Sequence, residues 1–220
     1  MPEVLVQYQD EISTAILQTF MMVGASVLAA IVIGLPIGTL IYLTRKGQLL
    51  ENRLLYSLLN LLVNIIRSFP FLLLVVFLIP FTRLLIGTAI GTTAAIVPLA
   101  IIAIAHYARL VEQSLLEVPK GVVEAALSMG ASVRDVVFKF LFVEARSGLV
   151  LGLTTSTISF ISYSTIMGVV GGGGIGDFAI RYGYQQFKTD LMMYMIVIMI
   201  ILVQCIQLGG TMLAKKLDKR

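Results

Sequence analysis

The chain has 220 residues, of which 58% are hydrophobic and 13% are charged, and this charged share is about half that of a soluble domain. Its single cysteine, Cys205, excludes an internal disulfide framework and a cysteine-based metal site, and its single histidine, His106, excludes zinc motifs that need two. The charged residues gather in clusters between long apolar stretches, which indicates bilayer spans, because a charge at mid-membrane is costly.

Five apolar stretches follow one another along the chain, and each is long enough to cross the hydrocarbon core of a bilayer. We therefore predict an all-α, polytopic membrane protein with five transmembrane helices, forming one transmembrane domain over residues 1–220. The predicted spans cover residues 12–44, 54–79, 88–108, 147–170 and 191–214. The first exceeds the about 20 residues that a span requires, and Pro36 is the expected position of a kink.

The second stretch is interrupted by three residues that are unusual inside a bilayer, Arg67, Ser68 and Pro70. An intramembrane arginine is a functional candidate by default, since its charge must be compensated. We consider all three residues candidates for translocation or gating. The structural alternative is that Arg67 pairs with a carbonyl group that Pro70 leaves without a donor, or that it extends toward the membrane interface.

Residues 109–146, between the third and fourth spans, form a long polar excursion. Pro119 suits the first turn of a helix, because the N–H that proline lacks has no partner there. The apolar residues that follow recur at helical spacing, and Gly130 is placed to end the helix in the left-handed conformation. The apolar face consists of Val122, Ala125, Ala126 and Met129.

A second helix is predicted after this glycine, because Ser132 and Asp135 form a Ser-x-x-Asp start signal. Its apolar positions are Val133, Val136, Val137, Phe140 and Leu141. The excursion is therefore expected to fold as two short amphipathic helices joined at a glycine. From the pattern alone, such a pair could pack on the membrane surface or dock another protein.

Residues 171–176 match G-x-G-x-x-G, but no strand precedes them, so we expect a tight reversal or close helix packing and no dinucleotide site. No G-x-x-x-x-G-K-[ST] sequence occurs in the chain, so the phosphate-binding loop for ATP is missing. In the fifth span, Met192 and Met193 could line a path for a thioether substrate, although ordinary packing or lipid contact is the simpler explanation. No catalytic triad, carboxylate pair or metal cluster can be assembled, so neither a catalytic nor a metal site is predicted.

The basic residues are distributed unevenly across the predicted membrane. Twelve lysine and arginine residues fall on the side of residues 109–146 and the C-terminus, three fall on the other side, and Arg67 lies within a span. The positive-inside rule then places the C-terminus in the cytoplasm and the N-terminus, with the acidic Glu3, outside. This asymmetry accounts for the net charge of +4, so nucleic acid is not a predicted partner, and contact with anionic lipid head groups is a secondary effect.

Residues 124–130, Glu-Ala-Ala-Leu-Ser-Met-Gly, resemble the EAA signature of permease subunits of bacterial ATP-binding-cassette importers. The tail of the signature departs from the family pattern, because aromatic residues replace aliphatic ones and Val143 stands where the family has proline. Further stretches resemble the methionine-importer permeases. They are residues 64–71, 79–83, 108–112, 171–177 and 182–184.

The resemblance implies that a cytoplasmic coupling helix sets into a groove of a separate ATPase subunit, which binds the ATP, so that this chain is no enzyme and holds no cofactor. The residues that it assigns to this helix are Glu124, Ala125, Ala126, Met129 and Gly130. It also implies a homodimer of this chain in a bacterial inner membrane, two ATPase subunits and an external substrate-binding (lipo)protein. The expected activity is import by alternating access of methionine, with both the L and D forms as candidates.

Two alternatives remain at this point. The nearer is the same importer class with another small solute, such as a quaternary ammonium compound or a different amino acid. The more distant are an ion channel, a secondary transporter or an intramembrane enzyme. A channel would show rings of polar residues along a pore-lining face, a secondary transporter often shows internal repeats, and an enzyme would show a polar catalytic cluster at depth. None of these features is visible in the sequence.

Overall fold

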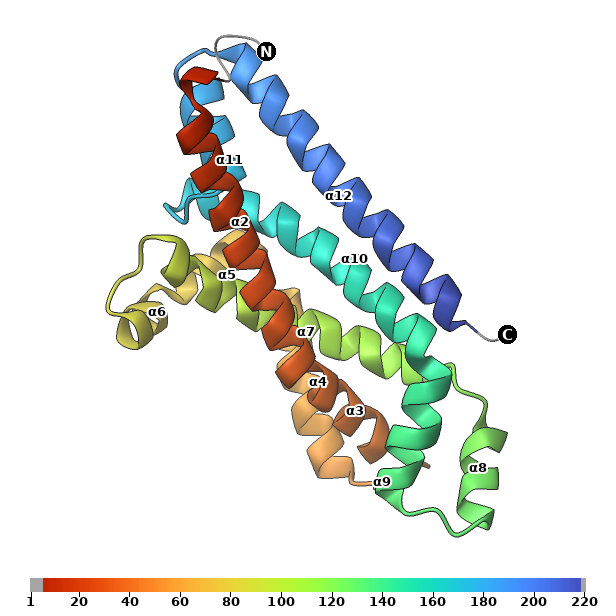
Figure 1. Ribbon diagram of the computed structural model, residues 1–220. Coiled ribbons are helices and arrows are strands. Elements are labelled where there is room, and N and C mark those ends of the chain that lie inside the picture. Colours follow the sequence, from red (N-terminus) through yellow and green to blue (C-terminus); the bar gives the residue numbers. More distant parts are fainter. Residues whose placement is uncertain (1–5, 219–220) are drawn as a thin grey trace.

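The computed structural model describes residues 6–218, and all regular secondary structure in that part of the chain is helical (Figure 1). The all-α prediction is therefore confirmed for these residues. Three residues that entered the topology prediction lie outside them: Glu3, Lys219 and Arg220.

The first helical stretch runs without interruption from α2 (Gln9–Ala29) through a π-helical turn, η1 (Ala30–Gly34), into α3 (Leu35–Thr44). The π turn lies directly before Pro36, which lacks an N–H and whose ring conflicts with the carbonyl group four residues earlier. The N–H of Leu35 bonds instead to a carbonyl group five residues back. The predicted kink is thus a widened turn inside one 36-residue helix.

The second predicted span is helical but not straight. α4 (Arg53–Ser68) and α5 (Phe71–Phe77) meet at an angle of 106°, and α6 (Ile79–Ile86) follows. Pro70 lies at the break, and the residue before it is extended, with ψ of 132°, as a residue before proline prefers. The predicted span over residues 54–79 thus contains a sharply bent pair of helices.

α7 (Thr92–Leu116) continues two turns past its predicted end at residue 108, and it contacts α2, α3, α4 and α10. Two glycines, Gly34 and Gly38, let α3 approach it closely. A Cβ atom at Gly34 would lie only 2.9 Å from the carbonyl oxygen of Ile104, and one at Gly38 would overlap the backbone of α7. Small residues four apart bring helix backbones together in this way. Because α7 contacts these four helices, it is the central helix of the bundle.

The next long helix begins earlier than predicted. α9 (Val133–Asp135), the π-helical turn η2 (Val136–Leu141) and α10 (Phe142–Val169) form one continuous helix. The second short helix expected after Gly130 is therefore not separate, because it runs directly into the span predicted to start at residue 147. The physical reason is the absence of any helix breaker: no Gly or Pro occurs in its first fifteen residues, and valine stands at the position of the family proline.

The Gly-rich segment after α10 forms the tight reversal that the sequence predicts, and it leads into α11 (Ile175–Phe178) and η3 (Ala179–Tyr184). The backbone N–H of Gly174 donates to Oε1 of Gln18 in α2 at 2.8 Å, which ties the reversal to the first helix. α12 (Thr189–Leu217) then runs along α10 to the end of the described residues (Figure 1).

Within residues 6–218, three helical stretches are long and apolar enough to cross a membrane, namely residues 9–44, 92–116 and 189–217. The bent pair α4–α5 makes a fourth if it counts as one span. α10 is long enough, but nine Ser and Thr residues between positions 147 and 165 lower its mean hydropathy. Most of these hydroxyl groups bond to the helix's own backbone, as Thr154 does when it donates to the carbonyl oxygen of Val150 at 2.8 Å.

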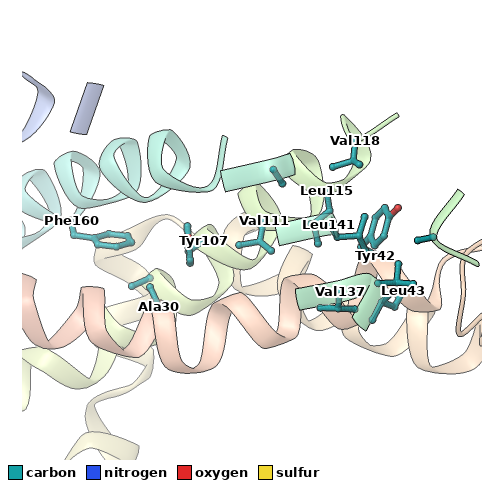
Figure 2. Close-up of a cluster of buried hydrophobic side chains, with 14 of the residues drawn as sticks. Ala30, Tyr42, Leu43, Tyr107, Val111, Leu115, Val118, Val137, Leu141 and Phe160 are labelled. Atoms are coloured by element: carbon teal, nitrogen blue, oxygen red, sulfur yellow. The ribbon is translucent and has the colours of Figure 1, made fainter. Parts of the chain in front are cut away.

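A buried apolar cluster extends along α7 and holds the bundle together (Figure 2). Its side chains come from α2, η1, α3, α7, η2 and α10, and at one end from the segment around α8 (Lys120–Ser128). Members labelled in Figure 2 include Tyr42, Tyr107, Val111, Leu115, Val118, Val137, Leu141 and Phe160. The membrane helices and the polar excursion therefore share one continuous core.

Candidate functional site

The EAA-like residues form α8, a nine-residue helix with sharp boundaries. It begins directly after Pro119, whose ψ of 132° lies outside the helical range, and it ends at Met129. Gly130 follows with φ of +78°, and its N–H donates to the carbonyl oxygen of Leu127 at 2.9 Å. The left-handed helix end that the sequence predicts at this glycine is confirmed.

One side of α8 packs against the protein's own core. Ala126 has no exposed surface and belongs to the same buried cluster as Val136 and Leu141 at the base of the long helix. Val122 and Val123 pack beside it and are half-buried. Of the predicted coupling residues, Ala126 is therefore turned toward the protein's own core, where its small side chain lets α8 lie close to the long helix.

The opposite side of α8 is open to a partner. Glu124, Ala125, Met129 and Gly130 are all exposed, Met129 to 70% of its surface. Glu124 and Lys120 also border a cavity of about 340 Å³ between α8 and residues 42–49. A carboxylate, a small residue and a flexible thioether on one surface can make charge-assisted and apolar contacts with another protein. Four of the five predicted coupling residues are thus accessible.

The start of the long helix is fixed by local hydrogen bonds. Oγ of Ser132 accepts the backbone N–H of Asp135 at 3.2 Å, so the predicted start signal is confirmed. The Asp135 carboxylate also accepts hydrogen bonds from Nζ of Lys139 and from the Ser132 hydroxyl, both at 2.6 Å. These contacts lower the pKa of the Asp135 carboxyl group, and the contact with Lys139 has the largest effect.

A buried polar group that the sequence analysis missed links α4 to α7. Arg109 forms an ion pair with Glu112, and its Nη2 donates to Oδ1 of Asn60 and to Oδ1 of Asn64, each at 2.7 Å. The Glu112 side chain is only 3% exposed and that of Arg109 15%. We call these four residues the α4–α7 polar group. The sequence carries a sign of this group. The two asparagines are four residues apart and the two charged residues are three apart, so each pair lies on one face of a helix.

Arg109 is the first residue of the predicted cytoplasmic segment, and α7 continues through it without a break. A charge in a helix that should cross the bilayer needs compensation. The Glu112 carboxylate and the amide oxygens of Asn60 and Asn64 compensate the charge of Arg109. The group therefore fixes α4 against the central helix.

Arg67 lies one turn beyond Asn64, in the last turn of α4, and is exposed. It is close enough to His106 of α7 for its charge to act on the imidazole. Within the described residues Arg67 makes no hydrogen bond or ion pair, so the expected contact with a carbonyl group freed by Pro70 is absent. Ser68 instead donates its hydroxyl to the carbonyl oxygen of Asn64 at 2.7 Å, which closes the last turn of α4.

The two methionines proposed for a thioether path lie elsewhere. Met192 is half-buried against Gly183, where a Cβ atom would come within 2.6 Å of the Met192 Cβ, and Met193 is 57% exposed. Both are at the start of α12, which Figure 1 places well away from α4. The structure therefore does not bring them together with Arg67.

Comparison with known proteins connects these features to a family. Residues 34–220 match the family described as binding-protein-dependent transport system inner membrane component. The probable D-methionine transport system permease protein MetI of Vibrio cholerae is 46% identical over 211 residues, which cover 96% of this chain and 94% of the relative. The methionine import system permease protein MetP of Bacillus subtilis is 42% identical over 181 residues, 82% of each chain.

Solved structures show the same similarity. A chain of the MetNI methionine ABC transporter in an inward-facing conformation has 40% identity and a TM-score of 0.94, with 100% of both chains covered. A chain from the crystal structure of an amino acid ABC transporter with histidines has a TM-score of 0.80 at 18% identity, and at that distance the likeness shows the fold alone.

Proposed function

The chain belongs to the family of binding-protein-dependent transport system inner membrane components, and from that premise we propose that it is the membrane-spanning subunit of an ATP-driven methionine importer. One observation carries this proposal: the chain is 46% identical, over 94% of the relative's length, to a permease named for D-methionine transport. The full-length match to a chain of the MetNI methionine ABC transporter, with a TM-score of 0.94, supports it.

Five spans are proposed for the subunit: residues 9–44, the bent pair α4–α5, α7, α10 and α12. The inclusion of α10 is supported by its position, since it contacts both α7 and α12. Its hydroxyl groups bond to its own backbone, for example Thr157 to the carbonyl oxygen of Leu153 at 2.8 Å, which lowers the cost of placing them in a bilayer. The chain thus forms a single transmembrane domain.

The basic residues support an orientation with the N-terminus outside and the C-terminus in the cytoplasm. One cluster of them lines a cavity of about 360 Å³ at the proposed cytoplasmic end of α4, together with Glu51 and Tyr56. Its cations are Arg45, Lys46 and Arg53. Such a basic site supports contact with anionic lipid head groups of the inner leaflet.

The exposed side of α8 is proposed as the docking surface for a separate ATPase subunit, because the chain lacks a phosphate-binding loop of its own. Glu124 and Met129 lie on this surface, while Ala126 on the opposite side packs against the base of the long helix. A displacement of α8 would therefore carry the long helix with it, since the two share one buried core.

The proposed assembly contains two copies of this chain, two ATPase subunits and an external substrate-binding protein. Binding of ATP closes the ATPase dimer, α8 moves with it, and the bundle changes from an inward-facing to an outward-facing arrangement. The binding protein delivers the substrate to the outward-facing form, and hydrolysis resets the cycle. No ATP is bound by the permease chain in this scheme.

Uptake measurements test the cargo. Cells that lack the chain should take up less labelled L-methionine and D-methionine, and the wild-type chain should restore the uptake. Choline and a second amino acid serve as control solutes, since they represent the alternative cargoes. Unchanged methionine uptake together with loss of choline uptake would move the assignment to a quaternary ammonium importer.

Affinity purification tests the assembly. The chain, extracted in a mild detergent, should bring a P-loop ATPase with it in a one-to-one ratio of subunits. A chain that purifies alone, or with a different class of protein, would argue against an ATP-driven importer and for a channel or secondary transporter.

A further inference from the structure

Among the proposed spans, α4 and α7 contain three charged residues beyond Arg53 at the start of α4, and one of the three lacks a counter-charge. These residues are Arg67, Arg109 and Glu112. Arg109 and Glu112 compensate each other in the α4–α7 polar group. Arg67 has no ion pair within the described residues, which include all of these spans.

Arg67 also lies deep in the proposed membrane region. Arg53 is the first residue of α4, and Arg67 follows it by fourteen residues. This separation corresponds to about 21 Å along the helix at about 1.5 Å per residue. The hydrocarbon core is about 30 Å thick. A guanidinium group at this depth must face water, protein or an anion, because contact with lipid chains is too costly.

The two faces of α4 show which side meets the lipid. One face is apolar and exposed, and it consists of Leu54, Leu58, Leu61, Leu62 and Ile65. The other carries Asn60, Asn64 and Arg67, spaced by four and then three residues, so these side chains lie on one side of the helix. Arg67 therefore points away from the face that is suited to lipid.

The polar side of α4 borders the central helix where α7 meets α10. Arg109 of α7 binds the two asparagines of α4, and the hydroxyl of Tyr107 donates to the carbonyl oxygen of Leu149 in α10 at 3.3 Å. His106, half-buried, lies on α7 between these two contacts. His106 also contacts Phe160 of α10, with ring centroids 6.2 Å apart.

α10 presents hydroxyl groups on its unpacked side. Thr155, Ser159 and Ser162 recur at helical spacing, and the first and last of them are exposed. Phe71 of α5, four residues after Arg67, stacks on Tyr163 of α10 with ring centroids 4.5 Å apart. This stacking holds the α4–α5 bend, next to Arg67, against α10.

We propose that Arg67 binds the carboxylate of the amino acid that the chain translocates, an inference that rests on the proposed function. The planar guanidinium group presents two parallel N–H donors that match a carboxylate, and the hydroxyl groups of α10 can accept hydrogen bonds from the substrate ammonium. The site takes small amino acids as zwitterions. It would not hold a quaternary ammonium compound that lacks a carboxylate.

The test uses the complete transporter, with its ATPase subunits and binding protein, reconstituted in proteoliposomes. Arg67→Gln removes the positive charge. Arg67→Lys keeps the charge but lacks the two parallel N–H donors of the guanidinium group. Arg83→Gln makes the same chemical change at an exposed arginine of α6 and serves as the control. Methionine uptake and the stimulation of ATP hydrolysis by the loaded binding protein are measured for each.

The expected result is a fall in uptake of about tenfold or more for Arg67→Gln, as for a lost charge-assisted contact. Arg67→Lys should recover part of the uptake, Arg83→Gln should match wild type, and ATP hydrolysis should still respond to the binding protein. Equal uptake by Arg67→Gln and wild type would overturn the proposal. A parallel loss of uptake and ATP hydrolysis that Arg67→Lys does not repair would also overturn it, because such a loss indicates a structural role. Wild type that imports no methionine would instead refute the proposed cargo.

Discussion

α7 and α12 are both long apolar helices, yet they occupy opposite kinds of position. In the most apolar window of α7, with mean hydropathy 1.9, 56% of the residues are buried, whereas in α12, with mean hydropathy 2.5, only 11% are. The buried residues of α7 include five alanines, while α12 buries only Leu191, Met195 and Ala214. In a bilayer the more apolar helix is therefore the more peripheral one, since small residues mark packing and large apolar residues mark contact with lipid.

The largest effect is expected from the charge buried on α7. Glu112→Gln leaves Arg109 without its counter-charge, and breaking a buried ion pair in this way costs about 3–5 kcal/mol. Asp190→Asn makes the same change at the exposed start of α12 and should alter stability little. The measurement is the thermal stability of the detergent-purified chain, and equal stability of the two variants would remove the distinction between central and peripheral helix.

The next effect concerns close helix contacts. Gly38→Ala places a Cβ against the backbone of α7, where no side chain can move aside, and it should destabilise by about 1–3 kcal/mol. Gly209→Ala on α12 meets nothing within 4 Å and should be neutral or slightly stabilising, because alanine favours a helix. If Gly209→Ala proved as harmful as Gly38→Ala, α12 would have a packing partner that a single copy of the chain does not supply.

The same contrast between buried and exposed positions occurs within α8 and can be tested with two neighbouring alanines. Ala126→Leu should cost about 1–3 kcal/mol of stability, because it overpacks the core beside Leu141. Ala125→Leu lies on the exposed side and should leave stability unchanged but reduce co-purification of the ATPase. Normal ATPase binding by Ala125→Leu would argue against the exposed side of α8 as the docking surface.

The smallest effect is expected at Asp135, where neither burial nor the bilayer contributes. Its folded pKa lies below the ordinary value of 3.8, so the stabilising contact with Lys139 is fully present above pH 3.8 and is lost as the pH falls through the folded pKa. The stability difference between wild type and Asp135→Asn should be constant from pH 8 to pH 5 and vanish in stronger acid. A difference that changes near neutral pH would assign the effect to another group.

The sequence predicted features that depend on local chemistry. Gly130 ends α8 in the left-handed conformation and Ser132 starts the next helix, because each depends on a few adjacent residues. The helical stretches also follow from apolar runs, as the apolar composition of residues 191–214 shows. Composition could not reveal the 106° bend between α4 and α5, since its direction depends on what the two helices pack against.

Contacts between distant segments were beyond the sequence. Nothing near Ala126 indicates that it faces Leu141 and not a partner, because both sides of α8 carry small or apolar residues. The polar group around Arg109 was not predicted, because its partners Asn60 and Asn64 lie more than forty residues earlier. Charged residues inside a membrane helix can be placed only when their partners on other helices are known.

The nine Ser and Thr residues of α10 have a consequence for how the chain is made. A segment with this many hydroxyl groups has less driving force to enter the bilayer than α12, whose most apolar window has a mean hydropathy of 2.5. With α10 as a span, its insertion depends on neighbours that are synthesised before and after it. Its biogenesis is therefore cooperative, and ribosome-bound chains that end before α12 should integrate α10 less completely than the full-length chain.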